Sequence, residues 1–216
     1  MEHLPKLDER LRQVMEYFPA CDLGADIGAD HGHLSCNLLK NGKARRMILT
    51  DISPDSLEKA RKLFRLHHME ELADFRIGDG FSALKEPVDA AAICGMGGDV
   101  ISRILSRGKE LLCRTELVLC PQTDIDKVRS CLNEVGYGIR DEKAVRAAGR
   151  FYVVVHAKPE NSSYSEKELF LGPELMKKKD PDTLHYYQWR LDVEKCVKNT
   201  DNADRIEWLE ELLCHG

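Results

Sequence analysis

Long apolar runs are absent from this sequence of 216 residues, and so is a basic segment leading into an apolar one at its start. A helix that crosses a membrane needs about 18 or more consecutive apolar residues, so we expect no membrane partner and a cytoplasmic protein. The composition, with 43% hydrophobic and 32% charged residues, excludes a disordered or collagen-like chain. At roughly 150 residues per domain, the length allows one full domain and a small appendage.

Paired cysteines are also missing. The eight cysteines are scattered singly without a Cys-x-x-Cys pair, so we expect free thiols rather than a disulfide framework. The pairs His31 with His33 and His67 with His68 have no partner cluster at zinc spacing, and we expect no metal site. Cys94 lies in an apolar segment typical of the core, with a thiol beside a ligand as the alternative.

The sequence has no overall excess of basic charge. Residues 1 to 158 contain 24 Lys and Arg against 24 Asp and Glu, whereas residues 159 to 216 contain 8 against 13, so the net charge of −5 lies in the tail. Basic clusters still occur at 43–46, 59–65 and 140–150. Such clusters are compatible with nucleic-acid binding and equally with solvated helix faces.

Short runs rich in Val, Ile, Leu and Ala alternate with helix-like stretches, which is typical of a parallel sheet covered on both faces. We therefore predict a doubly wound α/β fold. Its seven predicted strands are 22–27, 46–51, 74–77, 88–94, 116–120, 137–145 and 151–156. Only residues 146–150 separate the last two, too few for a crossover helix, so these strands must pair antiparallel on an otherwise parallel sheet.

Predicted helices fit between these strands, at 34–41, 54–68, 100–108 and 125–135. Ser53 is a suitable cap for the second of them, and Pro54 suits its first turn. Apolar residues at helical spacing between Leu7 and Phe18 predict a further helix before the first strand.

The composition changes after Pro159, where we predict a boundary between a domain at 1–158 and a helical domain at 159–216. Apolar residues at helical spacing in this tail predict an αα-hairpin with a coiled-coil seam and a turn at 199–202. The predicted seam consists of Tyr186, Trp189, Val193, Cys196, Ile206, Leu209 and Leu213.

A glycine-containing turn follows the first predicted strand, and turns at this place bind nucleotides in α/β folds. Its sequence is Asp26-Ile27-Gly28-Ala29-Asp30-His31-Gly32-His33. Asp51 ends the second strand 25 residues after Asp26, where a carboxylate can accept from both ribose hydroxyls. The glycine-containing turn and Asp51, at the ends of the first two predicted strands, together predict a nucleoside site at this edge of the sheet.

A third acidic residue, Asp79, follows the third strand in the turn Gly78-Asp79-Gly80. A carboxylate there can accept from an adenine amino group. Because Asp-Gly is common in ordinary turns, a plain turn is the alternative. The order of Asp26, Asp51 and Asp79 along the chain favours the binding role.

The charges of the first turn distinguish two candidate ligands. Gly28 and Gly32 do not form the G-x-G-x-x-G of dinucleotide sites, and Asp30 replaces the glycine that lets a pyrophosphate approach. A carboxylate repels a diphosphate by roughly 1 kcal/mol at 4 Å in water and by more when desolvated. S-adenosylmethionine carries a sulfonium and an ammonium without phosphate, so the acidic turn favours this methyl donor over NAD. For Asp30, a helix N-cap is the alternative.

Two further motifs follow the fourth and fifth strands, namely Gly95-Met96-Gly97-Gly98 and Cys120-Pro121-Gln122. With these motifs and the first turn, the chain resembles the bacterial tRNA adenine-22 N1-methyltransferases, a family of class I methyltransferases. The resemblance covers nearly the whole chain, from Arg10 and Leu11 to Gly172-Pro173 in the tail. One departure is Gln122, because the family has Gln-Pro-Asn at this point.

The resemblance implies methyl transfer from S-adenosylmethionine to N1 of an adenosine in tRNA, on a Rossmann-like seven-stranded sheet with a tail that helps to hold RNA. We further expect a monomer. The residues expected to bind the donor are Asp26, Gly28, Asp30, His31, Gly32, Asp51, Ile52, Gly78, Asp79, Gly80 and Gly95. Those expected at the reaction are Gly95, Met96, Gly97, Gly98, Pro121 and Gln122.

Adenine N1 has a free lone pair at neutral pH, so the expected catalysis consists of extruding the base, aligning N1 with the methyl group and excluding water. The stretch 95–98 has no carboxylate or amide to hold an exocyclic amine, which favours a ring nitrogen, although it can also be a tight turn before a helix. The rival functions are, first, a non-catalytic RNA-binding protein and, second, a small-molecule methyltransferase or nucleotide-sugar enzyme. The acidic residues argue against the first, and the lack of a large lid insertion argues against the second.

Overall fold

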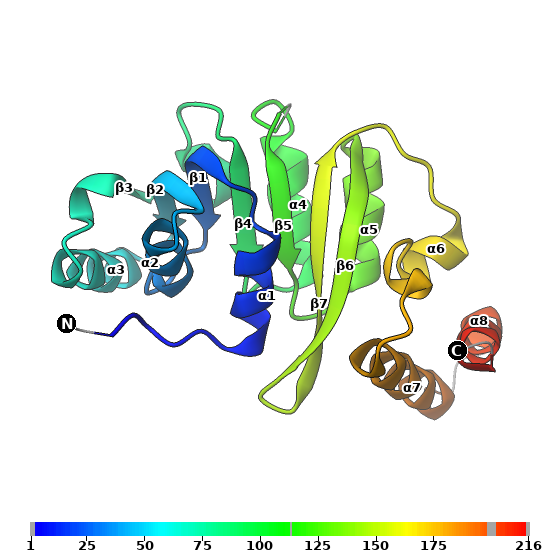
Figure 1. Ribbon diagram of the computed structural model, residues 1–216. Coiled ribbons are helices and arrows are strands. Elements are labelled where there is room, and N and C mark those ends of the chain that lie inside the picture. The colour runs from blue at the N-terminus through cyan, green and yellow to red at the C-terminus, as the bar shows by residue number, and fades with distance from the viewer. Residues whose placement is uncertain (1–2, 113, 198–201, 215–216) are drawn as a thin grey trace.

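The computed structural model describes residues 3–112, 114–197 and 202–214, and a mixed seven-stranded sheet forms its centre (Figure 1). The strand order is β3-β2-β1-β4-β5-β7-β6. The strands are β1 Cys21–Ile27, β2 Ala44–Asp51, β3 Ala73–Ile77, β4 Ala90–Cys94, β5 Glu116–Cys120, β6 Tyr137–Ala147 and β7 Arg150–Pro159. The first five are parallel, while β7 pairs antiparallel with both β5 and β6, so the predicted fold class is confirmed.

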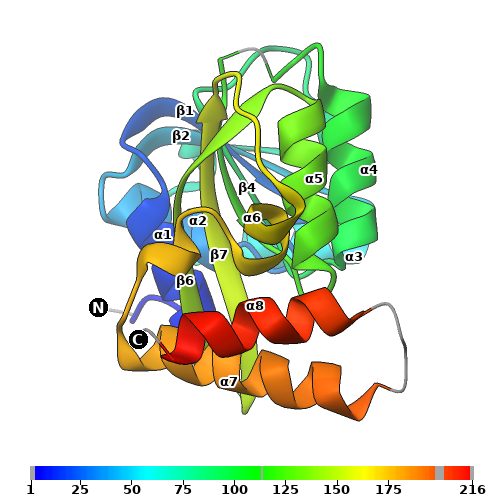
Figure 2. The same cartoon turned by 90° about the vertical axis from the view of Figure 1, so that its right-hand side faces the viewer.

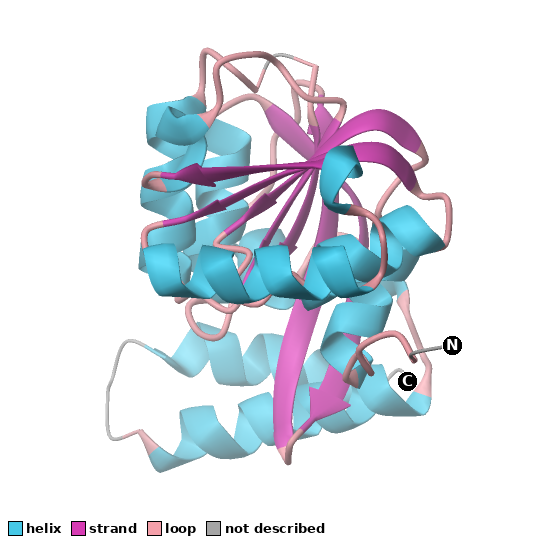
Figure 3. Ribbon diagram, turned by 90° about the vertical axis from the view of Figure 1, so that its left-hand side faces the viewer, coloured by secondary structure: helices cyan, strands magenta, loops and turns pink. Residues whose placement is uncertain are grey.

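Helices cover both faces of the sheet, and Figure 3 shows the twisted strands between them. The helices of the sheet region are α1 Glu9–Tyr17, α2 His33–Lys40, α3 Pro54–Leu66, α4 Gly98–Gly108 and α5 Ile125–Glu134, with 3-10 turns η1 Glu70–Leu72 and η2 Gly80–Ala83. One buried apolar cluster includes side chains of α1, α2 and α3, and a second includes side chains of α4 and α5. Within the described ranges, no helix is long and apolar enough to cross a membrane.

Two element ends differ from the prediction for identifiable reasons. Helix α3 ends at Leu66 because His68 has a positive φ of 56°, and the N–H of Met69 returns to the carbonyl of Phe64 at 2.9 Å. The strands of the last hairpin extend further than predicted, to a turn of only Ala148 and Gly149. Both turn residues have positive φ, 47° and 76°, which suits the twist of a two-residue hairpin.

The tail contains α6 Glu166–Leu171, η3 Leu175–Lys177, α7 Pro181–Cys196 and α8 Ala203–Cys214, and Figure 2 shows α7 beside α8. The predicted seam is wrong for three of its four residues on α7, since Trp189 and Val193 are 44% and 42% exposed and Cys196 is exposed, whereas Tyr186 is buried as predicted. Tyr187 and Leu191 are buried instead. Helix α7 packs against both β6 and α8. Its buried face is therefore wider than the narrow apolar stripe of a two-helix coiled coil.

Part of the predicted turn, at 199–201, lies outside the described residues. The tail shares the apolar cluster of α4 and α5, to which Phe170, Leu175 and Tyr187 contribute. The hydroxyl of Tyr187 donates to the carbonyl of Leu171 at 2.9 Å, which connects α7 to α6. The division of the chain into domains at 158 stays a prediction.

A buried ion pair joins the tail to the sheet. Arg129 of α5 donates from Nε to Glu142 of β6 at 2.7 Å, and both side chains are fully buried. The other oxygen of Glu142 accepts the backbone N–H groups of Glu174 and Leu175, at 3.1 Å each. Arg129 also donates to the carbonyls of residues 169 and 170. The pair therefore connects α5, β6 and the start of the tail.

Removing one partner of this pair should cost far more stability than removing an exposed charge. We expect Glu142→Ala to lower the free energy of unfolding by about 3–5 kcal/mol, because Arg129 would stay buried without its partner. Urea denaturation followed by circular dichroism measures the loss. Glu160→Ala, which removes the exposed partner of Arg140, is the matched control and should cost less than about 1 kcal/mol. Equal losses in the two variants would contradict the assignment.

Candidate functional site

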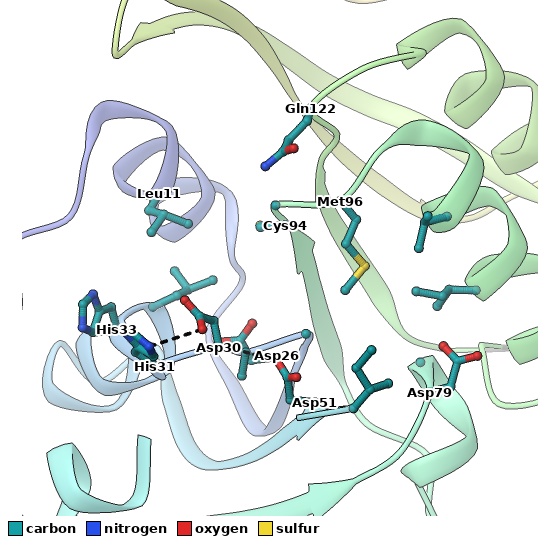
Figure 4. A pocket seen from close by; sticks show the side chains of 18 of the residues that line it. Leu11, Asp26, Asp30, His31, His33, Asp51, Asp79, Cys94, Met96 and Gln122 are labelled. Carbon is teal, nitrogen blue, oxygen red and sulfur yellow. Dashed lines mark hydrogen bonds and ion pairs between the residues drawn. The ribbon is translucent and has the colours of Figure 1, made fainter. Parts of the chain in front are cut away.

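A cavity of about 690 Å³ opens where β1, β2, β3 and β4 end, within the usual size range of small-molecule sites (Figure 4). It is lined by Arg10, Leu11, Asp26, Gly28, Ala29, Asp30, His31, His33, Leu34, Asp51, Ile52, Gly78, Asp79, Gly80, Cys94, Gly95, Met96, Val100, Arg103, Ile104 and Gln122. Most of the predicted site residues are therefore brought together. Of the predicted set, Gly32, Gly97, Gly98 and Pro121 do not line it.

The backbone holds the loops after the first three strands together. The N–H groups of Gly28 and Ala29 both donate to the carbonyl of Thr50, at 2.8 and 2.9 Å. The N–H of Gly78 donates to the carbonyl of Asp51 at 3.0 Å. Since these bonds join the ends of β1, β2 and β3, the acidic residues of the three loops are positioned by main chain rather than by flexible side chains.

Asp51 combines a structural role with remaining binding capacity. Its carboxylate accepts the N–H of Asp30 at 3.0 Å through one oxygen and the N–H of Ser53 at 2.8 Å through the other. An ionised carboxylate has about four acceptor positions, so about two remain for a ligand. The side chain lines the cavity (Figure 4), and two vicinal hydroxyls suit the remaining positions.

Asp26 is the buried acid of the cavity. Its side chain comes from the end of β1, the residue is 3% exposed, and it accepts the hydroxyl of Ser35 at 2.7 Å. Burial, which disfavours the charged form, raises the pKa of Asp26 to about 6, and the bonds from Ser35 oppose this shift. Near neutral pH the carboxylate is charged, and a cation in the cavity would stabilise it.

Of the residues after Asp26, Asp30 and His31 line the cavity, whereas Gly32 packs against α3. Asp30 has a positive φ of 48°, and its carboxylate accepts from Ser56 at 3.3 Å and lies 3.5 Å from Nε2 of His31. The alternative of an N-cap is wrong for Asp30, because Gly32 is the N-cap of α2 and that helix has no side-chain cap. A Cβ on Gly32 would lie 3.0 Å from the side chain of Ala60, so this glycine permits close packing of α2 on α3.

On the β3 side of the cavity lie Asp79, Gly78, Gly80 and Ile52. Asp79 precedes η2 without capping it through its side chain, and the nearest charge is Nη1 of Arg107 at 3.3 Å. Ile52 is 73% exposed although apolar. A flat apolar group bound between Ile52 and η2 would cover this side chain while Asp79 remained available as an acceptor.

The glycine cluster after β4 also divides in two. Gly95, with a φ of +77°, and Met96 line the cavity. The Met96 methyl group lies against Gly28, where a Cβ would come within 2.1 Å of it. Gly98 instead lies against the next loop, because its Cβ would lie 2.3 Å from the carbonyl oxygen of Asp124. Gly97 is the N-cap of α4, so the alternative of a tight turn before a helix applies to this half.

Gln122 follows β5 and reaches the rim of the cavity, with its amide directed toward it in Figure 4. The backbone N–H of Gln122 donates to the carbonyl of Met96 at 2.8 Å, and this bond joins the loops after β4 and β5. Pro121 is buried and does not line the cavity. Among the described residues, no group of three or more His, Cys, Asp or Glu side chains is arranged to hold a metal ion.

The prediction missed the lining residues that α1 and α4 contribute from opposite faces of the sheet. Helix α1 contributes Arg10 and Leu11, and α4 contributes Val100, Arg103 and Ile104. Helical spacing indicates that α1 has an apolar face but does not show that the helix crosses the strand ends. The only signal was the resemblance itself, which includes Arg10 and Leu11.

The fold and the site together define a class of protein. A doubly wound sheet with an antiparallel last pair, and with carboxylates after its first three strands, is the architecture of methyltransferase domains. Residues 7–155 match the family described as methyltransferase domain.

Comparisons over the whole chain are more specific. A tRNA (adenine(22)-N(1))-methyltransferase of Bacillus subtilis is 30% identical over 98% of both chains. A crystal structure of the Bacillus subtilis M1A22 tRNA methyltransferase matches with a TM-score of 0.87 and 28% identity, over 98% of this chain and 100% of that one. A putative tRNA (m1A22) methyltransferase of Streptococcus pneumoniae, in complex with S-adenosyl-L-methionine, matches with a TM-score of 0.90 and 26% identity, over 96% and 100%. The chain belongs to the tRNA (adenine-22-N1)-methyltransferase family.

The buried charge of Asp26 should make the protein without ligands less stable at neutral pH. The folded pKa of about 6 exceeds the unfolded value of about 3.9, so stability falls as the pH rises between these two values. Asn in this position keeps an oxygen for Ser35 and removes the charge. We expect Asp26→Asn to raise the free energy of unfolding by about 1–3 kcal/mol at pH 7 and by much less at pH 4.

Thermal unfolding at a series of pH values tests this expectation. Asp22→Asn is the matched control, since Asp22 lies on the same strand with its side chain 80% exposed, and it should leave the stability near that of wild type. A pH-independent difference between wild type and Asp26→Asn would contradict a buried carboxylate.

Proposed function

We propose that this protein transfers the methyl group of S-adenosylmethionine to N1 of adenosine 22 in tRNA. The observation that carries the proposal is the set of carboxylates around a cavity at the strand ends, in a chain related over its full length to proteins of that name. When bound, S-adenosylmethionine supplies an electrophilic methyl group, and the residues of this chain bind, orient and shield the reactants.

The donor fits the charge and shape of the cavity. Its sulfonium and ammonium groups suit the acidic side formed by Asp26 and Asp30, and the ribose diol suits the remaining acceptor positions of Asp51. Asp79 can accept from the adenine amino group while Ile52 covers a face of the ring. These assignments make the four acids the donor side of the cavity.

The acceptor base would enter from the other side, between Gly95 and Gln122. Gly95 lacks a side chain, and an added Cβ would meet nothing within 4 Å, so a flat base can approach the backbone there. Gln122 offers both a donor and an acceptor at the rim. Positioning the base near 3–3.5 Å from the methyl group and excluding water would supply most of the rate enhancement.

A ring nitrogen is the expected target because residues 95–98, which follow β4, carry no side-chain acceptor for an exocyclic amine. Residues 95–98 are Gly95, Met96, Gly97 and Gly98, without a carboxylate, an amide or an aromatic ring. Adenine N1 carries its own lone pair at neutral pH and needs no base to remove a proton. The proposed product is therefore 1-methyladenosine.

The donor assignment predicts that Asp51→Ala weakens the binding of S-adenosylmethionine. Loss of an acceptor for two hydroxyl groups should cost roughly 1.5–3 kcal/mol, or about 10- to 150-fold in affinity. Isothermal titration calorimetry measures the affinity, and a thermal melt shows whether the variant is folded. Unchanged affinity in a folded variant would show that Asp51 does not bind the ribose.

The product is identified by incubating the protein with labelled donor and unmodified tRNA and digesting the RNA to nucleosides. We expect label only in 1-methyladenosine, together with arrest of reverse transcriptase one nucleotide before position 22, because an N1 methyl group blocks pairing. A digest that contains only the N6 isomer would contradict the assigned nitrogen. A lack of transfer by a protein that binds the donor would favour the non-catalytic RNA-binding alternative.

A further inference from the structure

One exposed surface beside the cavity combines aromatic rings with arginines. The tip of the β6–β7 hairpin carries Arg146, Arg150 and Phe151, and α7 presents Trp189 next to them. The ring centroids of Phe151 and Trp189 are 5.7 Å apart, and the guanidinium of Arg146 lies 5.7 Å from the centroid of the Phe151 ring. We call these four residues the hairpin patch. Val193, one turn further along α7, extends its apolar part.

The positive charge of the hairpin patch is not neutralised. Neither Arg146 nor Arg150 forms an ion pair with a described residue, and both are exposed. Arg140, earlier on the same strand, is paired with a glutamate. In the cluster at 59–65, the arginines are bonded to Glu70. The hairpin tip therefore presents guanidinium groups without an ion-pair partner among the described residues, beside the exposed ring of Trp189 and the half-buried ring of Phe151.

The hairpin patch lies at the same edge of the sheet as the cavity. Strand β6 runs parallel to β5, because both pair antiparallel with β7. Leu119 pairs with Val155, so Phe151 lies roughly 10 Å beyond the end of β5 at about 3.3 Å per residue. Figure 1 shows the hairpin projecting past the strand ends beside α7.

Direct contacts connect the hairpin to the cavity wall. Tyr152, the residue after Phe151, holds the guanidinium of Arg10 at 5.2 Å from its ring centroid, and Arg10 lines the cavity. Gln122, which follows β5, lines the rim on the same side. A strand that delivers a base to the cavity therefore passes close to the hairpin tip.

We propose that the hairpin patch binds the RNA substrate beside its target nucleotide, with an unpaired base stacked on Trp189 and phosphates paired with Arg146 and Arg150. This inference rests on the proposed function. A base that enters the cavity leaves its stack, which disturbs its neighbours as well. Aromatic rings that stack on bases, combined with guanidinium groups, are the elements by which proteins hold unpaired nucleic acid.

The charges favour RNA over a second copy of this chain. In a two-fold interface the same surface occurs on both subunits, so the arginines of two hairpin patches would lie against each other. The tail has a net negative charge, with 8 basic against 13 acidic residues, so the attraction of RNA must be local. Arg146 and Arg150 provide it at the hairpin tip.

Point variants test this surface better than removal of the tail, because the tail contributes Phe170, Leu175 and Tyr187 to the core. For the double variant Arg146→Ala, Arg150→Ala we expect weaker tRNA binding and a plot of log affinity against log salt that is flatter by about 1.5. Trp189→Leu should weaken tRNA binding about 5- to 50-fold, and Trp189→Phe should restore most of the loss. Affinity for S-adenosylmethionine should stay unchanged in all variants.

Matched controls come from the opposite edge of the sheet. Arg45, near the start of β2, has a side chain that is 82% exposed, and Leu66, at the end of α3, is 51% exposed. We expect Arg45→Ala and Leu66→Ala to leave tRNA binding within about twofold of wild type, because neither contacts the strand that enters the cavity.

Fluorescence gives a direct test of stacking. The chain has two tryptophans, so Trp208→Phe leaves Trp189 as the single one. We expect unmodified tRNA to quench the fluorescence of Trp189 in the Trp208→Phe variant. The dissociation constant from this quenching should equal the one from binding assays. Quenching should be much weaker in Trp189→Phe, where only Trp208 remains.

Several results would overturn the inference. Folded variants with wild-type tRNA affinity and salt dependence would show that the hairpin patch does not contact RNA. A change of oligomeric state in Trp189→Leu, measured by analytical ultracentrifugation, would assign the surface to a second copy. If wild type still methylates tRNA in either of these cases, the hairpin patch is wrong but the proposed function stands. Failure of wild type to bind or methylate any tRNA would overturn both.

Discussion

The parallel alignment of β1 to β4 is the constraint on which the cavity depends. Parallel strands place their carboxyl ends at one edge, so residues separated by about 25 positions in sequence, such as Asp26, Asp51 and Asp79, reach a common space. Backbone bonds from the first loop to Thr50, and from the third to Asp51, then hold these loops in place. The site is thus positioned by main-chain hydrogen bonds of the sheet and its loops.

The buried pair of Arg129 and Glu142 performs a similar task for the tail. An arginine without its partner would be strongly destabilising in the core, and Glu142 in addition accepts two N–H groups of the tail backbone. The pair places the chain before α7 against β6, so α7 lies beside the hairpin. Together with the core contacts of Tyr187, this attachment positions Trp189 beside Phe151.

Binding capacity and stability compete in the cavity. Asp26 is almost completely buried, and the desolvation that raises its pKa to about 6 opposes folding of the charged form near pH 7. A bound cation would offset that cost, since it returns to the carboxylate the charge stabilisation lost with water. An acid that destabilises the protein without ligands is therefore consistent with a site for a positively charged donor.

The sequence by itself determined the class of fold and most of the acidic lining of the cavity. Apolar runs between helical stretches indicate a parallel sheet, a five-residue link forces the last pair antiparallel, and acids after successive strands must meet because parallel strands end together. Tertiary structure alone decided that α1 lies near the strand ends, where it brings Arg10 to the cavity. It also decided which face of α7 is buried and left Trp189 exposed. Helical periodicity shows that a helix has an apolar face, whereas the partner of that face is set by packing between distant segments.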